Sequence, residues 1–214
     1  MRPAPGTHIR YNFATNHPAS FRGWWFELWR TLCRFALFAG RFRTAGDWPD
    51  LKQAVLVAAP HTSNWDAIWM LAAAGHYRVR LRWMGKKSLT EGPFGWAARL
   101  AGCVPVDRQR AGDLVTAMAQ AFEETPDLLL AVAPEGTRDP VAEWKSGFWH
   151  IARAAKVPLL FTVMDYGTRT VYISGHYWPT DDYAADLAVI RSHYADARPR
   201  HHSRFSIESA KPKA

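Results

Sequence analysis

The sequence predicts an α/β domain with a central, mostly parallel or mixed sheet flanked by helices, preceded by an amphipathic helix. From residue 53 onward, short apolar runs alternate with helical patterns, and this alternation is typical of βαβ units. The 214 residues are enough for one such domain with its own core. Three segments are expected: a lead-in and helix over 1–44, the α/β domain over 45–196, and a basic, flexible tail over 197–214.

The first expected helix lies within residues 20–36 and has an aromatic face. The residues at helical spacing are Phe21, Trp24, Trp25, Leu28, Leu32, Phe35 and Ala36. Arginines, including Arg30 and Arg34, lie off this face. The pattern suits a helix lying in a lipid interface, and it equally suits a helix that packs on its own domain. Both interpretations remain open at this point.

The strands and helices expected after residue 53 alternate along the chain. Strands are predicted at 53–58, 79–84, 103–106, 128–132, 159–164 and 169–174. Helices are predicted at 65–74, 93–101, 114–123 and 147–156. The last two strands are expected to pair as a hairpin through residues 165–167.

Charge and aromatic content narrow the class of partner. The formal net charge is +8 and the chain contains 11 Trp, which favours an anionic partner and an apolar or interfacial one. The basic residues are dispersed and the chain contains no recognised nucleic-acid motif. We therefore expect that the anionic partner is a membrane surface and not a nucleic acid.

The two cysteines, Cys33 and Cys103, fit neither a disulfide framework nor a metal site. The first residues do not resemble a signal peptide, and no run reaches the roughly 18 apolar residues of a membrane-spanning helix. The expected location is therefore cytoplasmic, peripheral on the inner face of the cell membrane.

A histidine and an aspartate follow the first predicted strand, where α/β proteins place reactive groups. Thr62, Ser63 and Asn64 are residue types that begin helices. On one regular helix, His61 and Asp66 would point about 140° apart, so they meet only if His61 lies in the turn before the helix. A carboxylate that is hydrogen-bonded to one imidazole nitrogen leaves the other nitrogen basic. Alone, this spacing equally fits a surface turn with a capping aspartate.

A second polar cluster, Glu135-Gly136-Thr137-Arg138, follows the strand at 128–132. Gly136 allows the backbone to approach a ligand closely. Arg138 supplies a forked donor that matches phosphate. Alone, the cluster would fit a polar turn with a solvated arginine.

Basic residues follow two further strands. Lys86 and Lys87 come after one, and Arg108 comes after another. These residues and Arg138 are therefore expected to gather at one edge of the sheet. A positive rim beside a His–Asp pair suits an anionic substrate.

Four blocks occur in order: His61–Asp66, Val104–Arg108, Ala133–Arg138 and Val157–Phe161. Through these blocks the chain resembles the glycerolipid acyltransferase family typified by bacterial 1-acylglycerol-3-phosphate acyltransferase, over about residues 53–165. It looks most like the short members whose first block reads Pro-His-Thr-Ser-Asn-Trp-Asp. The resemblance implies a glycerol-3-phosphate acyltransferase-like α/β fold.

The resemblance also implies direct acyl transfer to a hydroxyl of a (lyso)phospholipid or related lipid acceptor. His61 would act as the general base, oriented by Asp66, and the donor would be acyl-CoA or acyl-carrier protein. The transfer would need no metal and no cofactor. The residues implied in binding the acceptor and its phosphate are Lys86, Lys87, Arg108, Glu135, Gly136, Thr137 and Arg138.

Two positions depart from the family pattern. Ala133 stands where the family has Phe, and Phe161 stands where it has a second Pro. Both are expected to lie near the catalytic and acceptor sites, which leaves the acceptor open. The alternatives are a non-phosphate acceptor, such as a lyso-aminolipid or a glycolipid sugar, and a lipid- or nucleic-acid-binding module without catalysis.

Overall fold

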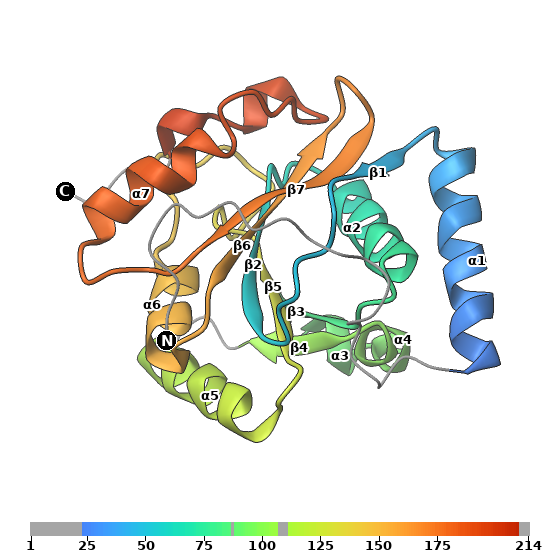
Figure 1. Cartoon of the computed structure of the whole chain (residues 1–214), viewed down its shortest axis with the longest axis horizontal. Coiled ribbons are helices and arrows are strands. Elements are labelled where there is room, and N and C mark those ends of the chain that lie inside the picture. Colours follow the sequence, from blue (N-terminus) through green and yellow to red (C-terminus); the bar gives the residue numbers. More distant parts are fainter. Residues whose placement is uncertain (1–22, 87, 107–110, 210–214) are drawn as a thin grey trace.

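The computed structural model describes residues 23–86, 88–106 and 111–209 (Figure 1). The α-helices are α1 (Trp24–Ala39), α2 (Asn64–His76), α3 (Ser88–Glu91), α4 (Gly95–Leu100), α5 (Ala111–Glu124), α6 (Gly147–Ala155) and α7 (Tyr183–Ser192). The strands are β1 (Arg43–Ala45), β2 (Ala54–Ala59), β3 (Leu81–Lys86), β4 (Cys103–Val106), β5 (Leu129–Val132), β6 (Leu159–Asp165) and β7 (Thr170–Tyr177). Two 3₁₀ turns follow, at His202–Arg204 and Ile207–Ser209.

The strands form a single seven-stranded sheet in the order β1-β7-β6-β2-β5-β3-β4. Neighbouring strands are parallel except for β6 and β7, which are antiparallel. The mostly parallel, mixed sheet predicted from the sequence is therefore confirmed, as is the pairing of the last two predicted strands. Strand β2 lies near the centre of the strand order, between β5 and β6, so the turn that follows it lies midway along the carboxyl-terminal edge of the sheet.

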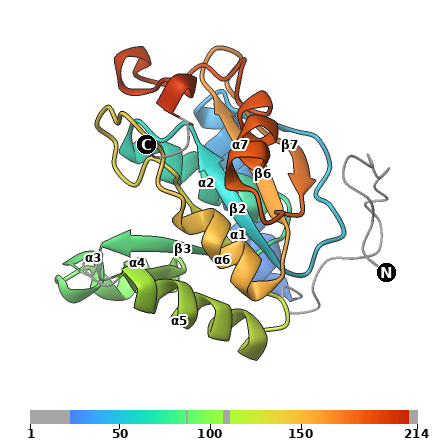
Figure 2. The ribbon, with the colours of Figure 1, turned by 90° about the vertical axis from the view of Figure 1, so that its left-hand side faces the viewer.

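The sheet is covered on both faces (Figures 1 and 2). Alternate residues of β2 point to opposite sides: Val55 and Val57 pack in one core with α6 and α7, whereas Ala54 and Leu56 pack in another with α2. Helix α5 lies beside α6 on the first side, and α1 lies outside α2 on the second. Burial on both faces explains why β2 is a continuous apolar run.

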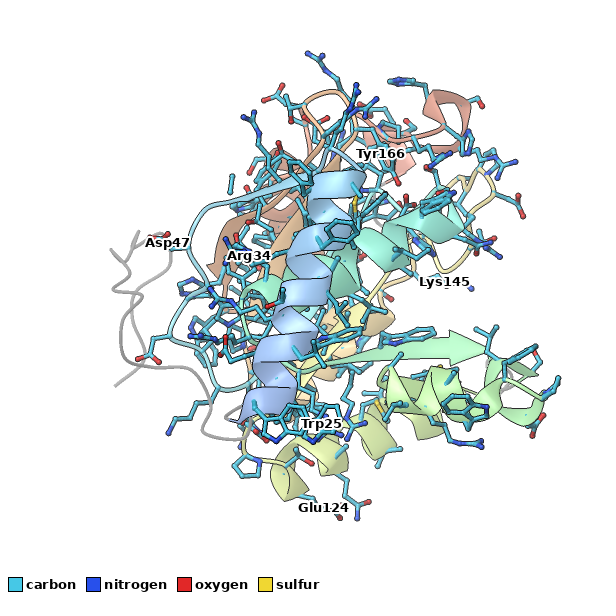
Figure 3. All side chains as sticks on the ribbon, turned by 90° about the vertical axis from the view of Figure 1, so that its right-hand side faces the viewer. Trp25, Arg34, Asp47, Glu124, Lys145 and Tyr166 are labelled. Atoms are coloured by element: carbon cyan, nitrogen blue, oxygen red, sulfur yellow. The ribbon has the colours of Figure 1, made fainter. Side chains whose placement is uncertain are left out.

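Helix α1 packs on α2 through a narrow buried stripe. Cys33 and Leu37 are buried, and Gly75 of α2 lies so close that an added Cβ would come within 2.3 Å of the Cys33 sulfur. The wide aromatic face of α1 remains in solvent (Figure 3). Within the described ranges, no helix is both long and apolar enough to cross a membrane.

The carboxyl-terminal part is more structured than the sequence predicts. Helix α7 was missed, and residues 198–209 pack against the domain. The Tyr166 N–H donates to the Arg198 carbonyl at 2.8 Å, and Phe205 and Ile207 pack on the core. Of the flexible tail expected over 197–214, the described part therefore packs on the domain, and residues 210–214 lie outside the described residues. The short elements β1 and α3 were also missed.

Candidate active site

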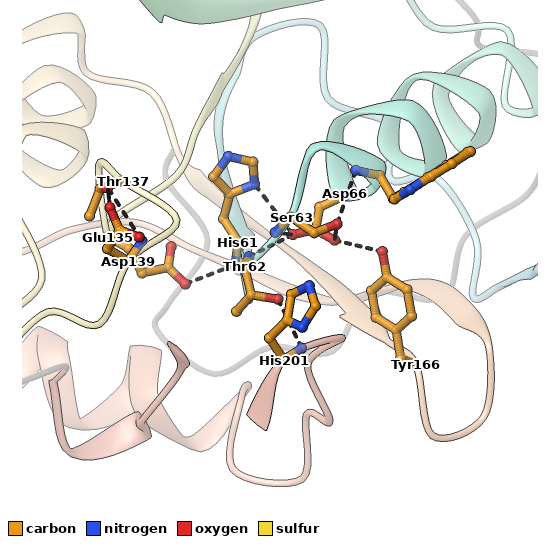
Figure 4. A network of polar contacts seen from close by, with 10 residues as sticks. His61, Thr62, Ser63, Asp66, Glu135, Thr137, Asp139, Tyr166 and His201 are labelled. Atoms are coloured by element: carbon orange, nitrogen blue, oxygen red, sulfur yellow. Dashed lines mark hydrogen bonds and ion pairs between the residues drawn. The ribbon is translucent and has the colours of Figure 1, made fainter. Parts of the chain in front are cut away.

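His61 lies in the turn between β2 and α2, the position that its five-residue spacing from Asp66 requires. Ser63 caps α2 by accepting from the Trp65 N–H at 3.0 Å, and Asp66 closes a capping box by accepting from the Ser63 N–H at 2.7 Å. His61 Nδ1 is 3.6 Å from Asp66 Oδ2 (Figure 4). The structure thus places the pair together, with the aspartate in the first turn of the helix and the histidine just before it.

Several donors fix the Asp66 carboxylate. Oδ2 accepts from the Thr62 N–H at 2.6 Å as well as from Ser63, and Oδ1 accepts from the Tyr166 hydroxyl at 2.6 Å. Hydrogen bonds of this kind favour the charged carboxylate and restrict its orientation. Burial, followed by the bond to Asp66, raises the pKa of Tyr166, so this hydroxyl remains a donor at physiological pH. Asp66 itself is buried, whereas the His61 side chain is 26% exposed.

Glu135 lies on the other side of the His61 turn from Tyr166 (Figure 4). Its Oε1 accepts from the His61 backbone N–H at 2.9 Å. Its Oε2 is buried and has no hydrogen-bond partner within the described ranges. Burial raises the pKa of Glu135 to about 7, and the hydrogen bond from the His61 N–H acts in the opposite direction. Glu135 is 2% exposed and is not among the residues that line the cleft described next, so it supports the His61 backbone from behind.

His61 lies in an open cleft of about 1650 Å³. The cleft extends from the carboxyl ends of β2, β5 and β6 towards β3 and α5. Its apolar lining includes Met70, Met84, Leu114, Val115, Val132 and Ile151. Among the described residues, its cationic lining is formed by Arg138, Lys145, Arg200 and Arg204, and His61, His150 and His201 also line it. A cleft that is apolar along its walls and cationic at its polar end suits a ligand with a hydrocarbon chain and an anionic group.

The electrostatic surroundings favour the neutral imidazole of His61. Burial lowers the pKa of His61, and the Arg138 guanidinium lowers it further, whereas the Asp66 carboxylate raises it; the net direction is downward. His61 is therefore a free base at neutral pH. Because Asp66 faces Nδ1, the nitrogen left to accept a proton is Nε2.

The structure describes only some of the other residues that were predicted to bind the acceptor and its phosphate. Gly136, Thr137 and Arg138 line the cleft. Gly136 has a positive φ of 64°, and a Cβ there would meet the Lys145 side chain at 3.0 Å, which accounts for glycine at this position. Lys86 ends β3. Lys87 and Arg108 lie outside the described residues.

The two departures from the family pattern differ in position. Ala133 lines the cleft, as expected. Phe161 is fully buried in β6, where its ring stacks on His193 with centroids 4.1 Å apart. Phe161 does not line the cleft, because its side chain points from β6 into the core that also contains Tyr194.

Sequence reasoning missed Tyr166 and the carboxyl-terminal arginines. Tyr166 follows the carboxyl end of β6, which pairs in parallel with β2, so its position at the same edge of the sheet was a usable signal. Arg200 and Arg204 gave no such signal, because they follow α7 in a polar segment with no element of predicted structure.

Residues 41–165 match the sequence profile of the family described as Acyltransferase. The chain belongs to this acyltransferase family. The match includes both the His61–Asp66 block and the Ala133–Arg138 block, and it ends one residue before Tyr166.

Among curated relatives of this acyltransferase is the 1-acyl-sn-glycerol-3-phosphate acyltransferase alpha of Ovis aries, 32% identical over 117 residues. The 1-acyl-sn-glycerol-3-phosphate acyltransferase of Streptococcus pneumoniae is 29% identical over 113 residues. Each alignment covers 52% of this chain, but only 40% and 42% of the respective relatives.

A solved structure shares the fold. The 1-acyl-sn-glycerophosphate (LPA) acyltransferase PlsC from Thermotoga maritima aligns with a TM-score of 0.54 over 79% of this chain and 78% of its own, at 17% sequence identity. At that identity the likeness establishes the fold alone, which agrees with the α/β fold predicted from the sequence.

Proposed function

We propose that the chain transfers a fatty acyl group from acyl-CoA or acyl-carrier protein to a hydroxyl of a lysophospholipid or related lipid. The observation that carries the proposal is the His61–Asp66 pair, with 3.6 Å between Nδ1 and Oδ2, in a cleft with apolar walls and a cationic end. The names of the Ovis aries and Streptococcus pneumoniae relatives support an acylglycerol phosphate acceptor.

In the proposed mechanism, His61 Nε2 takes the proton from the acceptor hydroxyl. The oxygen attacks the thioester carbonyl carbon, a C–O bond forms, and the C–S bond breaks as the tetrahedral intermediate collapses. The thiolate leaves and receives the proton from the imidazolium. Asp66 stabilises that imidazolium and holds the ring, and such proton transfer contributes about 10²–10⁴-fold to rate. A neutral His61 at pH 7 suits the first step.

The residues around the pair receive separate roles. Glu135 positions the His61 backbone through the 2.9 Å bond to its N–H. Arg138, Gly136 and Thr137 lie along the cleft and contribute to the acceptor site. Arg108 remains part of the proposed phosphate site through its place in the second family block, and Lys86 and Lys87 remain part of it through their place upstream of that block.

A second candidate acceptor keeps the same chemistry and lacks a phosphate. Ala133 supports it, because it lines the cleft at a position where the family has the much larger Phe. A lyso-aminolipid or a glycolipid sugar would use that additional space. Acyl transfer to such an acceptor but not to lysophosphatidic acid would select this alternative.

We also propose that the protein binds the membrane peripherally, on its cytoplasmic side. The exposed apolar side chains of α1 support this, since Trp24, Trp25 and Phe35 are each about two-thirds exposed. Further exposed apolar side chains on other elements are Trp65, Ile68, Leu89, Phe94, Trp96 and Leu100. Flotation with anionic vesicles tests the proposal: replacing Trp24, Trp25 and Phe35 by Ser should reduce binding, and unchanged binding would exclude α1 as the anchor.

The acyl transfer itself is tested with labelled acyl-CoA and acyl-carrier protein against a panel of lysolipids in mixed vesicles. The panel includes lysophosphatidic acid, lysophosphatidylethanolamine, a lyso-aminolipid and a glycolipid. We expect a new acyl ester on one class of acceptor, identified by mass spectrometry. Hydrolysis of the donor without ester formation on any acceptor would contradict the proposal.

A further inference from the structure

The segment at residues 198–204 lies outside the part of the chain that matches the family profile. Its sequence, Arg-Pro-Arg-His-His-Ser-Arg, contains three arginines, two histidines and no acidic residue. The segment follows α7 and returns the chain to the carboxyl-terminal edge of the sheet, where the His61 turn also lies.

Hydrogen bonds made by the backbone groups of this segment hold it beside the proposed catalytic pair. The Arg198 carbonyl accepts from the Tyr166 N–H at 2.8 Å, and the Arg198 N–H donates to Asp165 Oδ1 at 3.3 Å. The His201 N–H donates to Thr62 Oγ1 at 3.3 Å, which ties the segment to the residue after His61 (Figure 4). Downstream, Phe205 packs against the hydrophobic core. The position of the segment is therefore fixed from both ends.

Two arginines of this segment line the cleft that contains His61, namely Arg200 and Arg204. The Arg200 guanidinium lies over the Trp65 ring at 5.6 Å from its centroid, and 6.0 Å from the centroid of Tyr166, the donor to Asp66. Contact with two aromatic rings holds the guanidinium at the mouth of the cleft.

Neither arginine forms an ion pair with a carboxylate of the described residues, although Asp139 and Glu143 also line the cleft. Other surface arginines do: Arg153 pairs with Asp181, Arg191 with Glu208, and Arg78 with Glu27. Cations that face a cleft without an internal counter-ion are available to an anionic ligand, and the forked guanidinium matches phosphate oxygens.

We infer that Arg200 and Arg204 form an anion-binding site that receives a phosphate group of one of the two substrates at the mouth of the cleft. These two arginines come from the segment after α7, whereas Arg138 follows β5 within the family blocks and lines the same cleft. The site rests on the proposed function for its role in acyl transfer. The phosphate could belong to a lipid acceptor or to the nucleotide part of CoA, and its chemistry is the same in both.

The test compares the double variant Arg200→Gln/Arg204→Gln with the wild type. The control is Lys52→Gln/Arg80→Gln, which removes the same charge from exposed residues just before β2 and β3, at the opposite edge of the sheet. Calorimetric titration with CoA, and separately with sn-glycerol 3-phosphate, measures binding without turnover. KM for donor and acceptor is then measured in the transfer assay.

We expect the double variant to weaken binding of one probe about tenfold or more, a fold-change typical of losing charge-assisted hydrogen bonds, and to raise the KM of the matching substrate. Weaker CoA binding assigns the site to the donor, and weaker glycerol phosphate binding assigns it to the acceptor. If both affinities match those of the control variant, the inference is wrong, even when vesicle flotation is reduced. Because the titrations need no turnover, failure of the transfer reaction alone would count against the proposed function and not against this site.

Discussion

Two buried aspartates, Asp66 and Asp186, show what separates a candidate catalytic carboxylate from a structural one. Asp186 is fully buried and accepts from Trp149 Nε1 at 2.7 Å, the Tyr177 hydroxyl at 2.8 Å and Thr180. Asp66 is nearly as buried and has a comparable set of backbone and hydroxyl donors. Burial and hydrogen bonding therefore do not distinguish them.

The difference lies in their neighbours. Beside Asp66 is the imidazole of His61, whose other nitrogen remains available at an open cleft. The donors to Asp186 join α6, β7 and the start of α7, and Asp186 does not line that cleft. A buried carboxylate thus becomes a candidate catalytic group when it orients a base that a substrate can reach. The same two residues provide a direct comparison by mutation.

The largest effect is expected for Asp66→Asn. The amide cannot stabilise the imidazolium as a carboxylate does, so kcat/KM should fall about 10²–10⁴-fold. Because Asp66 raises the pKa of His61, its loss should also move the acid limb of the pH–rate profile to lower pH. Steady-state kinetics between pH 5 and 8 measure both changes. Activity within threefold of wild type would remove Asp66 from the mechanism.

Asp186→Asn should have the opposite profile. An amide has one acceptor oxygen, so some of the buried donors would lose their partner, at a cost of about 1–3 kcal/mol in the free energy of unfolding. Turnover per folded molecule should stay within about threefold of wild type. Urea denaturation and active-fraction kinetics separate the two effects. A folded Asp186→Asn protein as inactive as Asp66→Asn would remove the distinction drawn between these residues.

A smaller effect on activity is expected for Glu135→Gln. Only Oε1 of this carboxyl has a hydrogen-bond partner among the described residues. The folded-state pKa of Glu135 is raised from 4.5 to about 7, so the group favours folding most below pH 4.5, and this contribution is lost as pH rises towards 7. Gln keeps an acceptor for the His61 N–H and does not ionise. The wild type should therefore lose more stability than the variant between pH 5 and 8.

Thermal unfolding of both proteins across that pH range measures the difference. Glu135→Ala, which also removes the acceptor for the His61 N–H, should lower kcat far more than Glu135→Gln does. Parallel pH–stability curves for wild type and Glu135→Gln would show that Glu135 does not titrate in this range.

The sequence was sufficient to predict the sheet and the turn that brings His61 to Asp66. Strands buried on both faces are continuous apolar runs, and the five-residue spacing of His61 and Asp66 allows contact only across a helix start. Contacts between distant segments could not be predicted in the same way. Tyr166 reaches Asp66 across 100 residues of sequence, and Phe205 anchors a segment whose composition is otherwise polar.

The periodicity of apolar residues also could not show whether the apolar face of a helix is buried or exposed. Helices α1 and α6 both show an apolar stripe, but Phe148 and Ile151 of α6 are fully buried, whereas Trp24 and Phe35 of α1 are about two-thirds exposed. The pattern indicates that a face is apolar, and only the arrangement of the whole chain decides what covers it. For this reason the sequence could not decide whether the first helix lies in a lipid interface or packs on its own domain.

The most direct test of the account is the single turnover of His61→Ala with acyl donor and acceptor in mixed vesicles. His202→Ala is the matched control, because His202 is exposed and does not line the cleft. The account predicts that His61→Ala stays folded and loses at least about 10²-fold in the rate of ester formation, whereas His202→Ala keeps the wild-type rate. A folded His61→Ala protein that forms the acyl ester at a near-normal rate would contradict it.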